Sequence, residues 1–358
     1  MNTDTRRWTP ITLLALAALA SPASAQFNSG STGAYGAMNI TTNTTLNLPD
    51  DGVFHCTTVN VASGATLTFN KNALNTPVYI LATGNVTIAG AINVNGKANS
   101  GALPGEGGPG GFRGGFGAVG NLPYGTGLGP GGAAGNAGNG TFYGVYGNAA
   151  LIPLVGGSGG GCYFGNGGSG GGGAILIASN TQITITGSVS ALRGSGNGYE
   201  GSAGAIRLVA PLVNGTGSVT VGSNNTGRIR IDTEDRLAWR TLTVDNVPGF
   251  AYGSRMAVFP SPLPRIDLLN VAGTAIAEGT TSAATITLPP GSSSSQNVQA
   301  KVSGMTGTVD VITAVIPENG TRVLTTTSVD MSGGGPVTID VPVTIPVGGR
   351  VAIEVYKK

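Results

Sequence analysis

The chain has 358 residues, enough for about two domains, and only 9% of them are Asp, Glu, Lys or Arg. The formal net charge is +2, which excludes the strongly basic surface typical of proteins that bind nucleic acid. One histidine and two cysteines leave few groups for metal binding, proton transfer or nucleophilic attack. We therefore expect a protein that is not an enzyme, with no catalytic residue, no cofactor and no nucleic-acid partner.

Residues 1–25 have the pattern of a signal peptide. Arg6 and Arg7 precede an apolar run at 11–20, and the Ser-Pro-Ala-Ser-Ala sequence at 21–25 is typical of a cleavage site. The apolar run is shorter than a membrane span requires. We expect an exported protein that is extracellular or attached to the cell surface, with the periplasm as the alternative compartment. We expect no membrane span in the mature chain.

After a polar lead-in at 26–45, short runs rich in β-branched residues are separated by Gly and Asn, which predicts strands. The apolar pattern of residues 78–96 recurs at 174–191 and at 205–221, and a truncated copy begins at Arg228. A unit of three short strands cannot bury its own apolar face, whereas stacked units can. The alternative is an antiparallel sandwich of hairpins, which would favour two-residue turns of the Asn-Gly type, and these are few here.

The repeat therefore predicts an all-β protein whose first domain is a parallel β-solenoid in two parts, 46–97 and 173–232. Residues 233–265 would cap the last turn and connect it to the next domain, with Trp239 and Phe250 covering the open end. Residues 266–358 contain about seven runs with longer alternation, typical of a small immunoglobulin-like β-sandwich. The six side chains expected to point into the solenoid are those of Ile80, Ile88, Ile177, Ile185, Leu208 and Val219.

The insertion between the two solenoid parts, residues 98–172, holds about half of the chain's 63 glycines. Glycine either leaves a chain flexible or lets backbones approach more closely than a Cβ atom permits. From Gly105 to Gly120, and again from Gly129 to Gly138, glycine recurs at every third position. Two alternatives stay open for this tract: a disordered low-complexity loop, or a packed bundle of extended left-handed helices of the polyglycine II type.

Several motifs resemble those of glycine-rich secreted bacterial proteins with a parallel β-helix fold at the cell surface or in the matrix. They are Gly-Gly-Gly-Gly-Ala-Ile-Leu-Ile-Ala at 170–178, Ile-Thr-Gly-Ser-Val-Ser-Ala at 185–191, Gly-Ala-Ile-Arg-Leu-Val-Ala-Pro at 204–211 and Gly-Arg-Ile-Arg-Ile-Asp at 227–232. The resemblance covers about 50–260, implies a fold, and carries over no catalytic residue. By composition, the glycine tract is also similar to the polyglycine II bundles of some phage adhesins and antifreeze proteins.

Asp232, Glu234 and Asp235 are weak candidates for a metal site, because clustered carboxylate oxygens suit calcium. The alternative is an ion-pair cluster with the arginines nearby. The remaining acidic pair, at 50–51, lies in Pro-Asp-Asp-Gly, which is typical of a turn, and we expect His55 to be packed or at an edge.

Cys56 and Cys162 are an even pair in a protein expected to be exported, which predicts one disulfide between them.

The leading hypothesis is a non-enzymatic structural or adhesive protein of a surface, sheath, matrix or fibre. It would self-associate into a homo-oligomer or filament through its β edges or ends. One alternative is a β-helix that binds or cleaves a polysaccharide, with a cell-surface glycan as its partner. The other is an ice-binding protein, for which Thr87, Thr184 and Thr220 would form one column.

Overall fold

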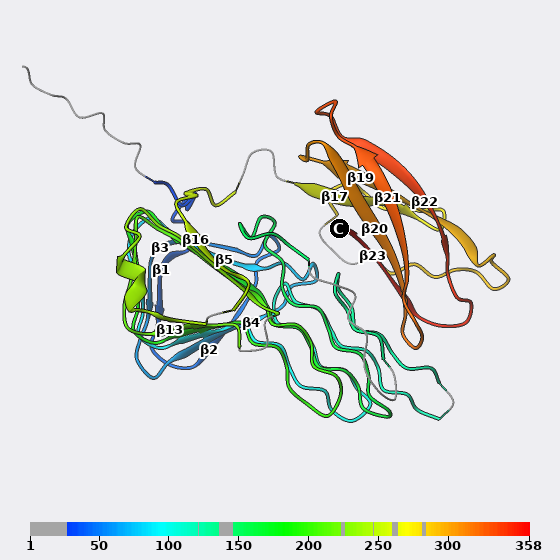
Figure 1. The fold of residues 1–358 in the computed structure, drawn as a ribbon, viewed down its shortest axis with the longest axis horizontal. Coiled ribbons are helices and arrows are strands. Elements are labelled where there is room, and N and C mark those ends of the chain that lie inside the picture. The colour runs from blue at the N-terminus through cyan, green and yellow to red at the C-terminus, as the bar shows by residue number, and fades with distance from the viewer. Residues whose placement is uncertain are drawn as a thin grey trace, which may run out of the picture.

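The computed structural model describes residues 27–120, 122–135, 146–222, 226–245, 247–259, 264–280 and 284–358. The predicted signal peptide at 1–25 lies outside the described residues. Within them the protein is nearly all β, with one short 3-10 helix, η1 (Ala238–Thr241). Figure 1 shows three parts: a ring of stacked strands, a lobe of loops beside it, and a C-terminal domain of longer strands.

The ring consists of three columns of parallel strands around one apolar core. The first column contains β3 (Val53–Val61), β5 (Val78–Ala82), β8 (Ala174–Ser179), β11 (Ala205–Val209), β14 (Arg228–Asp232) and β16 (Phe250–Gly253). The second continues from the far half of β3 through β6 (Val86–Ile88), β9 (Gln182–Ile185) and β12 (Leu212–Asn214). The third contains β2 (Thr44–Asn47), β4 (Thr66–Asn70), β7 (Ala91–Asn93), β10 (Ser188–Ser190), β13 (Ser218–Thr220) and β15 (Thr243–Val244), while β1 (Gly36–Ile40) pairs with β3.

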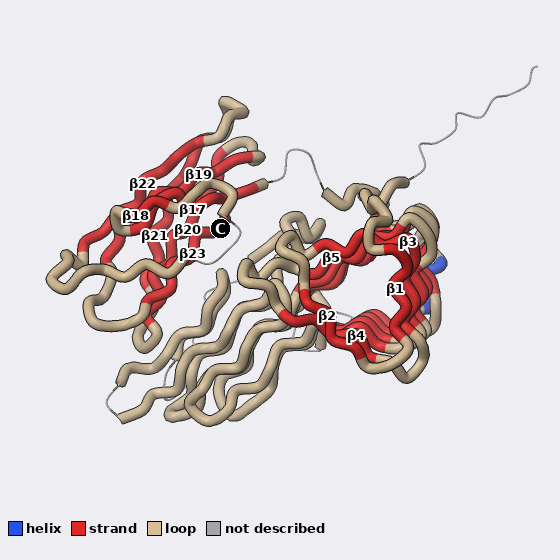
Figure 2. Tube along the Cα trace, turned by 180° about the vertical axis from the view of Figure 1, so that it is seen from behind, coloured by secondary structure: helices blue, strands red, loops and turns tan. Residues whose placement is uncertain are grey.

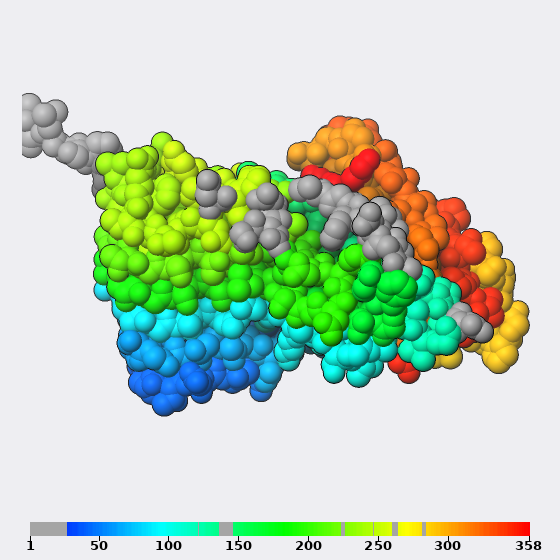
Figure 3. Space-filling model, turned by 60° about the horizontal axis from the view of Figure 1, so that its bottom comes forward, coloured from blue at the N-terminus to red at the C-terminus, as the bar shows by residue number. Residues whose placement is uncertain are grey.

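The register between these strands matches the sequence repeat. Ile80 pairs with Ile177, which in turn pairs with Leu208, and Ile88 pairs with Ile185 in the next column. Each inward side chain thus rests on its counterpart one layer away. All six side chains predicted to point inward are fully buried in one cluster, which confirms that prediction. Figure 3 shows the layers in chain order, from blue through cyan and green to yellow-green.

The stack is longer at both ends than the sequence indicated. Strand β1 lies within residues 26–45, which were expected to be a lead-in, because its apolar pattern is only two residues long, Met38 and Ile40. At the other end, β16 extends the first column beyond Asp232 to Gly253. There the ring of Trp239 packs on Phe250, with ring centres 5.4 Å apart, so the two residues expected to cap this end lie together.

The described part of the glycine tract is ordered by its own backbone. Successive N–H groups along residues 168–173 point to three neighbouring segments in turn, and the pattern repeats after three residues. The donor and acceptor pairs are Gly168 with Gly115, Ser169 with Tyr199, Gly170 with Lys97, Gly171 with Phe112, Gly172 with Ser202, and Gly173 with Val94. A period of three is that of an extended helix with three residues per turn. Of the two alternatives, the packed bundle therefore describes these residues.

We call this part the glycine lobe: residues 95–135, 156–173 and 192–204, as far as the structure describes them. Its segments lie so close that side chains would not fit between them. A Cβ atom at Gly171 would lie 1.9 Å from the carbonyl oxygen of Gly157, and one at Gly168 would lie 1.9 Å from that of Gly160. The lobe extends from one side of the ring (Figure 2).

The C-terminal domain is built from two antiparallel sheets. One contains β17 (Arg265–Val271), β18 (Thr274–Ala275), β19 (Ser295–Ser303) and β22 (Val337–Thr344), and the other contains β20 (Thr308–Pro317), β21 (Val323–Asp330) and β23 (Val351–Lys357). Val298 and Val341 of the first sheet share an apolar cluster with Val315 of the second, so the sheets pack on one another. The described part of residues 265–357 therefore contains seven strands, β17 to β23, where the sequence predicted about seven.

Candidate functional site

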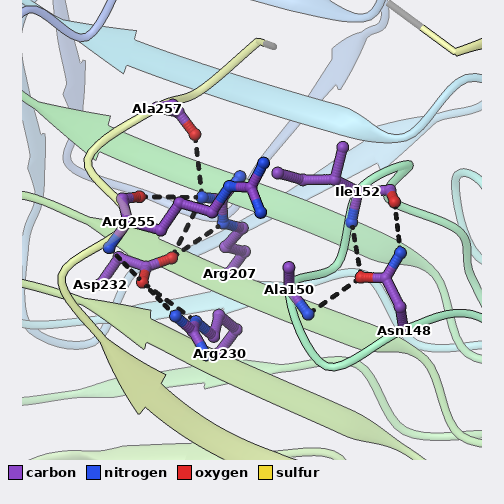
Figure 4. Close-up of polar contacts among 8 residues, drawn as sticks. All are labelled: Asn148, Ala150, Ile152, Arg207, Arg230, Asp232, Arg255 and Ala257. Carbon is purple, nitrogen blue, oxygen red and sulfur yellow. Dashed lines mark hydrogen bonds and ion pairs between the residues drawn. The ribbon is translucent and has the colours of Figure 1, made fainter. Parts of the chain in front are cut away.

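Asp232 lies in a buried cluster of charges rather than in an open site. Its Oδ2 accepts from Arg207 Nη2 at 3.0 Å, and its Oδ1 accepts from Arg230 Nη2 at 2.6 Å and from the backbone N–H of Arg255 at 2.9 Å (Figure 4). The side chains of Asp232 and Arg207 are both fully buried. Both carboxylate oxygens are thus occupied by donors of this chain, and neither faces an entering ligand.

Arg207 shares this cluster and ties it to the connector. Its Nη2 also donates to the carbonyl oxygens of Arg255 at 3.2 Å and Ala257 at 2.8 Å. Burial lowers the pKa of Arg207, and the adjacent carboxylate of Asp232 acts in the opposite direction. A buried pair of this kind holds segments in place, because separating either partner would leave a charge without compensation. The cluster therefore clamps β11 and β14 to the connector around residues 254–258.

The other two calcium candidates have different surroundings. Glu234 and Asp235 are exposed. Asp235 Oδ1 accepts from the backbone N–H groups of Leu237 at 2.9 Å and Ala238 at 3.1 Å, and so orders the start of η1. Within the described ranges, no three His, Cys, Asp or Glu side chains are grouped so that they could hold a metal ion. The structure therefore does not bring the three predicted ligands together.

The acidic pair near the start of the stack and the single histidine have local structural roles. Asp51 Oδ1 accepts from the N–H of Val53 at 2.9 Å, in a turn where Gly52 has a φ of +75°. His55 lies within β3, where it is the register partner of Leu81 on β5, and its Nδ1 accepts from the N–H of Thr32 at 3.2 Å. These contacts agree with the turn expected from the sequence and with the first of its two alternatives for His55, a packed position.

The disulfide predicted between Cys56 and Cys162 is not formed in this structure, and both are free and buried thiols. Cys56 points into the apolar core of the stack, where it belongs to the main cluster. Cys162 lies in the glycine lobe, where its N–H donates to the carbonyl oxygen of Gly125 at 3.0 Å. Counting cysteines could not reveal that one would face the core and the other a separate lobe.

The three threonines considered for an ice-binding column do not form one. Thr87 and Thr184 are register partners on β6 and β9. Thr220 lies on β13 in the other sheet, where it pairs with Ser190. The column therefore contains two threonines rather than three.

A cavity of about 1650 Å³ opens between β17 and β23 of the C-terminal domain. Its floor is apolar and includes Leu268, Val271 and Ile353. No histidine or cysteine lines it, and its few charged residues are not grouped. The cavity offers apolar surface but no set of groups for acid–base or nucleophilic chemistry.

Within the described residues, both ends of the parallel stack have strands with an unpaired outer edge, but their surroundings differ. At the far end, β16 pairs only with β14 and β15 only with β13, and the rings of Trp239, Phe250 and Tyr252 pack together there. At the near end, β1 pairs only with β3 and β2 only with β4, so no described residue pairs with their outer edges. A stretch without charge, residues 27–49, marks this end in the sequence.

No helix among the described residues is long and apolar enough to cross a membrane. Comparison with known proteins finds no family model, no curated protein and no solved structure that matches this chain. The function must therefore be argued from the surfaces and contacts described above.

Proposed function

We propose that this chain is an exported, non-enzymatic structural or adhesive protein that self-associates through the near end of its parallel stack. In this proposal the stack is a β-solenoid, and the C-terminal domain is an immunoglobulin-like sandwich. The signal-peptide pattern at 1–25 supports export. Of the carboxylates near the end of the repeat, Asp232 is buried in an ion-pair cluster, whereas Glu234 and Asp235 lie on the surface. Their separation supports a role without catalysis.

The observation that carries the proposal is the unprotected edge at the near end. Strand edges that stay solitary are usually protected by charged side chains, proline or a covering loop. Here β1 and β2 have no charged residue and no proline. Residues 27–49 contain no charged residue at all, and Asp50 is the first to follow them. The far end has charged neighbours, among them Arg236 and Arg240.

The backbone at this edge offers free hydrogen-bonding groups. The N–H of Leu48 donates to the carbonyl oxygen of Asn70 at 3.2 Å, toward the interior of the stack. Because N–H groups alternate in direction along a strand, those of Thr45 and Asn47 point to the open edge. A second copy can supply acceptors for them by adding a strand beside β2.

The near edges lie in a stretch without charge, whereas Arg236 and Arg240 flank the far edges, so we expect assembly through the near ends. Two copies joined through their near ends would form a twofold dimer in which each open edge covers the other. The charged residues beside the far edges would then disfavour further growth through the stacks. We therefore expect a dimer as the product of this interface, with any longer fibre requiring a second surface.

The test compares two substitutions at one position of β2. Thr45→Pro removes the outward N–H and should convert the dimer to a monomer, whereas Thr45→Val loses the same hydroxyl but keeps the N–H and should remain dimeric. Light scattering after gel filtration measures the mass, and circular dichroism checks that both variants are folded. A wild-type protein that stays monomeric at high concentration would contradict the proposal, as would a dimer unaffected by Thr45→Pro.

A further inference from the structure

The far turns of the glycine lobe gather exposed apolar side chains at one place. Leu103, Val119 and Leu122 are each more than half exposed, Phe164 is 49% exposed and Tyr163 is 38% exposed. These turns are neighbours in space. The N–H of Ala118 donates to the carbonyl oxygen of Phe164 at 3.0 Å, and that of Gly117 donates to Ala102 at 2.8 Å. We call these five side chains the lobe tip.

Aromatic rings form the centre of the lobe tip. The ring of Tyr163 meets that of Phe164 edge to face, with centres 4.6 Å apart, and that of Tyr199 at 5.5 Å. The ring of Tyr163 thus lies at a steep angle to each of its two neighbours, in the edge-to-face arrangement that aromatic pairs favour. Exposed apolar patches on proteins commonly mark contact sites.

Phe164 is held in a conformation that its residue type avoids. Its φ is +50°, in the left-handed region where a bulky side chain is a genuine outlier. Glycine would fit this backbone without strain, and the surrounding tract supplies glycine at many positions. An unfavourable residue whose side chain reaches solvent at such a place indicates a role for that side chain beyond folding.

The chemistry around the rings favours a neutral ligand. The three turns, residues 99–104, 116–125 and 162–167, contain no charged residue, which disfavours phosphate groups and anionic lipids as partners. They do contain amide and hydroxyl groups, including those of Asn99, Ser100 and Asn166. A pyranose ring has C–H groups on its faces and hydroxyl groups on its rim, so it can stack on an aromatic ring while its rim bonds to amides. The segment that carries Tyr199 adds one carboxylate, Glu200, which pairs with Arg193, and so does not supply the two carboxylates that cleave a glycosidic bond.

We propose that the lobe tip binds a neutral polysaccharide by stacking sugar rings on Phe164 and Tyr163. This surface is separate from the near end of the stack, so the protein would hold a second copy through one surface and a glycan through the other. The inference adds an adhesive partner to the proposed function and does not depend on dimer formation.

The experiment measures binding of the intact protein to three neutral polysaccharides: cellulose, chitin and starch. We expect retention on at least one of them, and a loss of affinity of at least tenfold in Phe164→Gly and in Tyr163→Ala. Phe164→Gly relieves the positive φ, so its melting temperature should equal or exceed that of the wild type while binding is lost. If Phe164 served only the fold, this variant would bind as the wild type does.

Two control variants and two comparison surfaces make the outcome decisive. Phe259→Ala removes another exposed ring, which packs on Tyr79 of β5, and should bind as the wild type does. Thr45→Pro should also retain full glycan binding, which separates a failure of this proposal from a failure of the dimer interface. No retention on any of the three polysaccharides would overturn the proposal, as would retention only on a phenyl matrix or on phosphatidylcholine vesicles.

Discussion

Single glycines decide how the centre of the lobe can pack. Gly171 donates its N–H to the carbonyl oxygen of Phe112 and accepts, through its own carbonyl oxygen, the N–H of Gly108 at 3.0 Å, so both groups are bonded to segment 108–112. A Cβ atom on Gly171 would point at Gly157 of another segment. No direction around it is left for a side chain. Such glycines act through close backbone approach, whereas the glycines of exposed turns act through their freedom of φ.

Replacing Gly171 with alanine tests this distinction. The added Cβ would lie 1.9 Å from the carbonyl oxygen of Gly157, and since backbone surrounds the site the segments must move apart. We expect Gly171→Ala to lower the free energy of unfolding by roughly 2–3 kcal/mol. Urea unfolding measures this change.

The matched control is Gly333→Ala, because a Cβ there would meet nothing within 4 Å. Its free energy of unfolding should stay within about 0.5 kcal/mol of the wild type. Equal stability of the two variants would show that close packing does not require glycine in the lobe.

The two cysteines give a second test at the scale of single residues. Burial raises the pKa of the Cys56 thiol to about 11, and it also raises the pKa of Cys162. Both groups are therefore protonated near neutral pH and shielded from reagents. We expect Ellman's reagent to label neither in the folded protein, and to label both after denaturation without reductant. Denatured, unreduced protein with no reactive thiol would instead support the disulfide expected from the cysteine count.

Among the elements, the strands of the repeat and of the C-terminal domain were the most predictable. Alternation and β-branched residues indicated β5 and β8, and the repeat indicated which of them would be neighbours. Strand β1 was missed because it has only two buried apolar side chains, Met38 and Ile40, among small and polar residues. Its pairing depends on the layer beneath it, which local sequence does not encode.

The candidate surfaces were less predictable than the elements. Arg207 lies between Ile206 and Leu208 on β11, both of which belong to the apolar core, and its own side chain is on the outer face of the strand. The connector covers it there and adds the carbonyl oxygens of Arg255 and Ala257, a contact that the sequence analysis did not predict. For the lobe tip, the sequence contained the aromatic residues but not the fact that three turns distant along the chain lie side by side. Both depend on contacts between segments far apart in sequence.

At the scale of the whole molecule, the C-terminal domain is joined to the glycine lobe by a set of polar contacts. The N–H of Gly129 donates to both carboxylate oxygens of Glu354, at 3.2 and 3.0 Å, and the carbonyl oxygen of Gly129 accepts from Arg322 Nη1 at 2.7 Å. Nearby, the N–H of Gly320 donates to the carbonyl oxygen of Tyr124 at 3.2 Å. One residue of the lobe thus binds both an acid and a base of the domain, which fixes how the domain sits beside the proposed glycan-binding turns.

The stability of these contacts between the C-terminal domain and the glycine lobe should depend on pH through Glu354. Burial raises the pKa of Glu354 above its ordinary value, although Gly129 N–H and the Arg322 and Arg113 guanidinium groups act in the opposite direction. A carboxyl group whose pKa is raised in the folded state stabilises that state fully below its ordinary pKa. This contribution is lost as the pH rises through the raised value.

Glu354→Gln keeps an acceptor for Gly129 and removes the titration, so its stability relative to the wild type should increase from about pH 4 to neutral pH. Thermal unfolding across this range measures the difference. The matched variant Glu278→Gln removes a carboxylate that pairs with Lys301 on the surface of the same domain, and so controls for the loss of one negative charge outside the contacts with the lobe. If the melting temperature of Glu354→Gln changed with pH in parallel with that of the wild type, Glu354 would not be the source of the pH dependence.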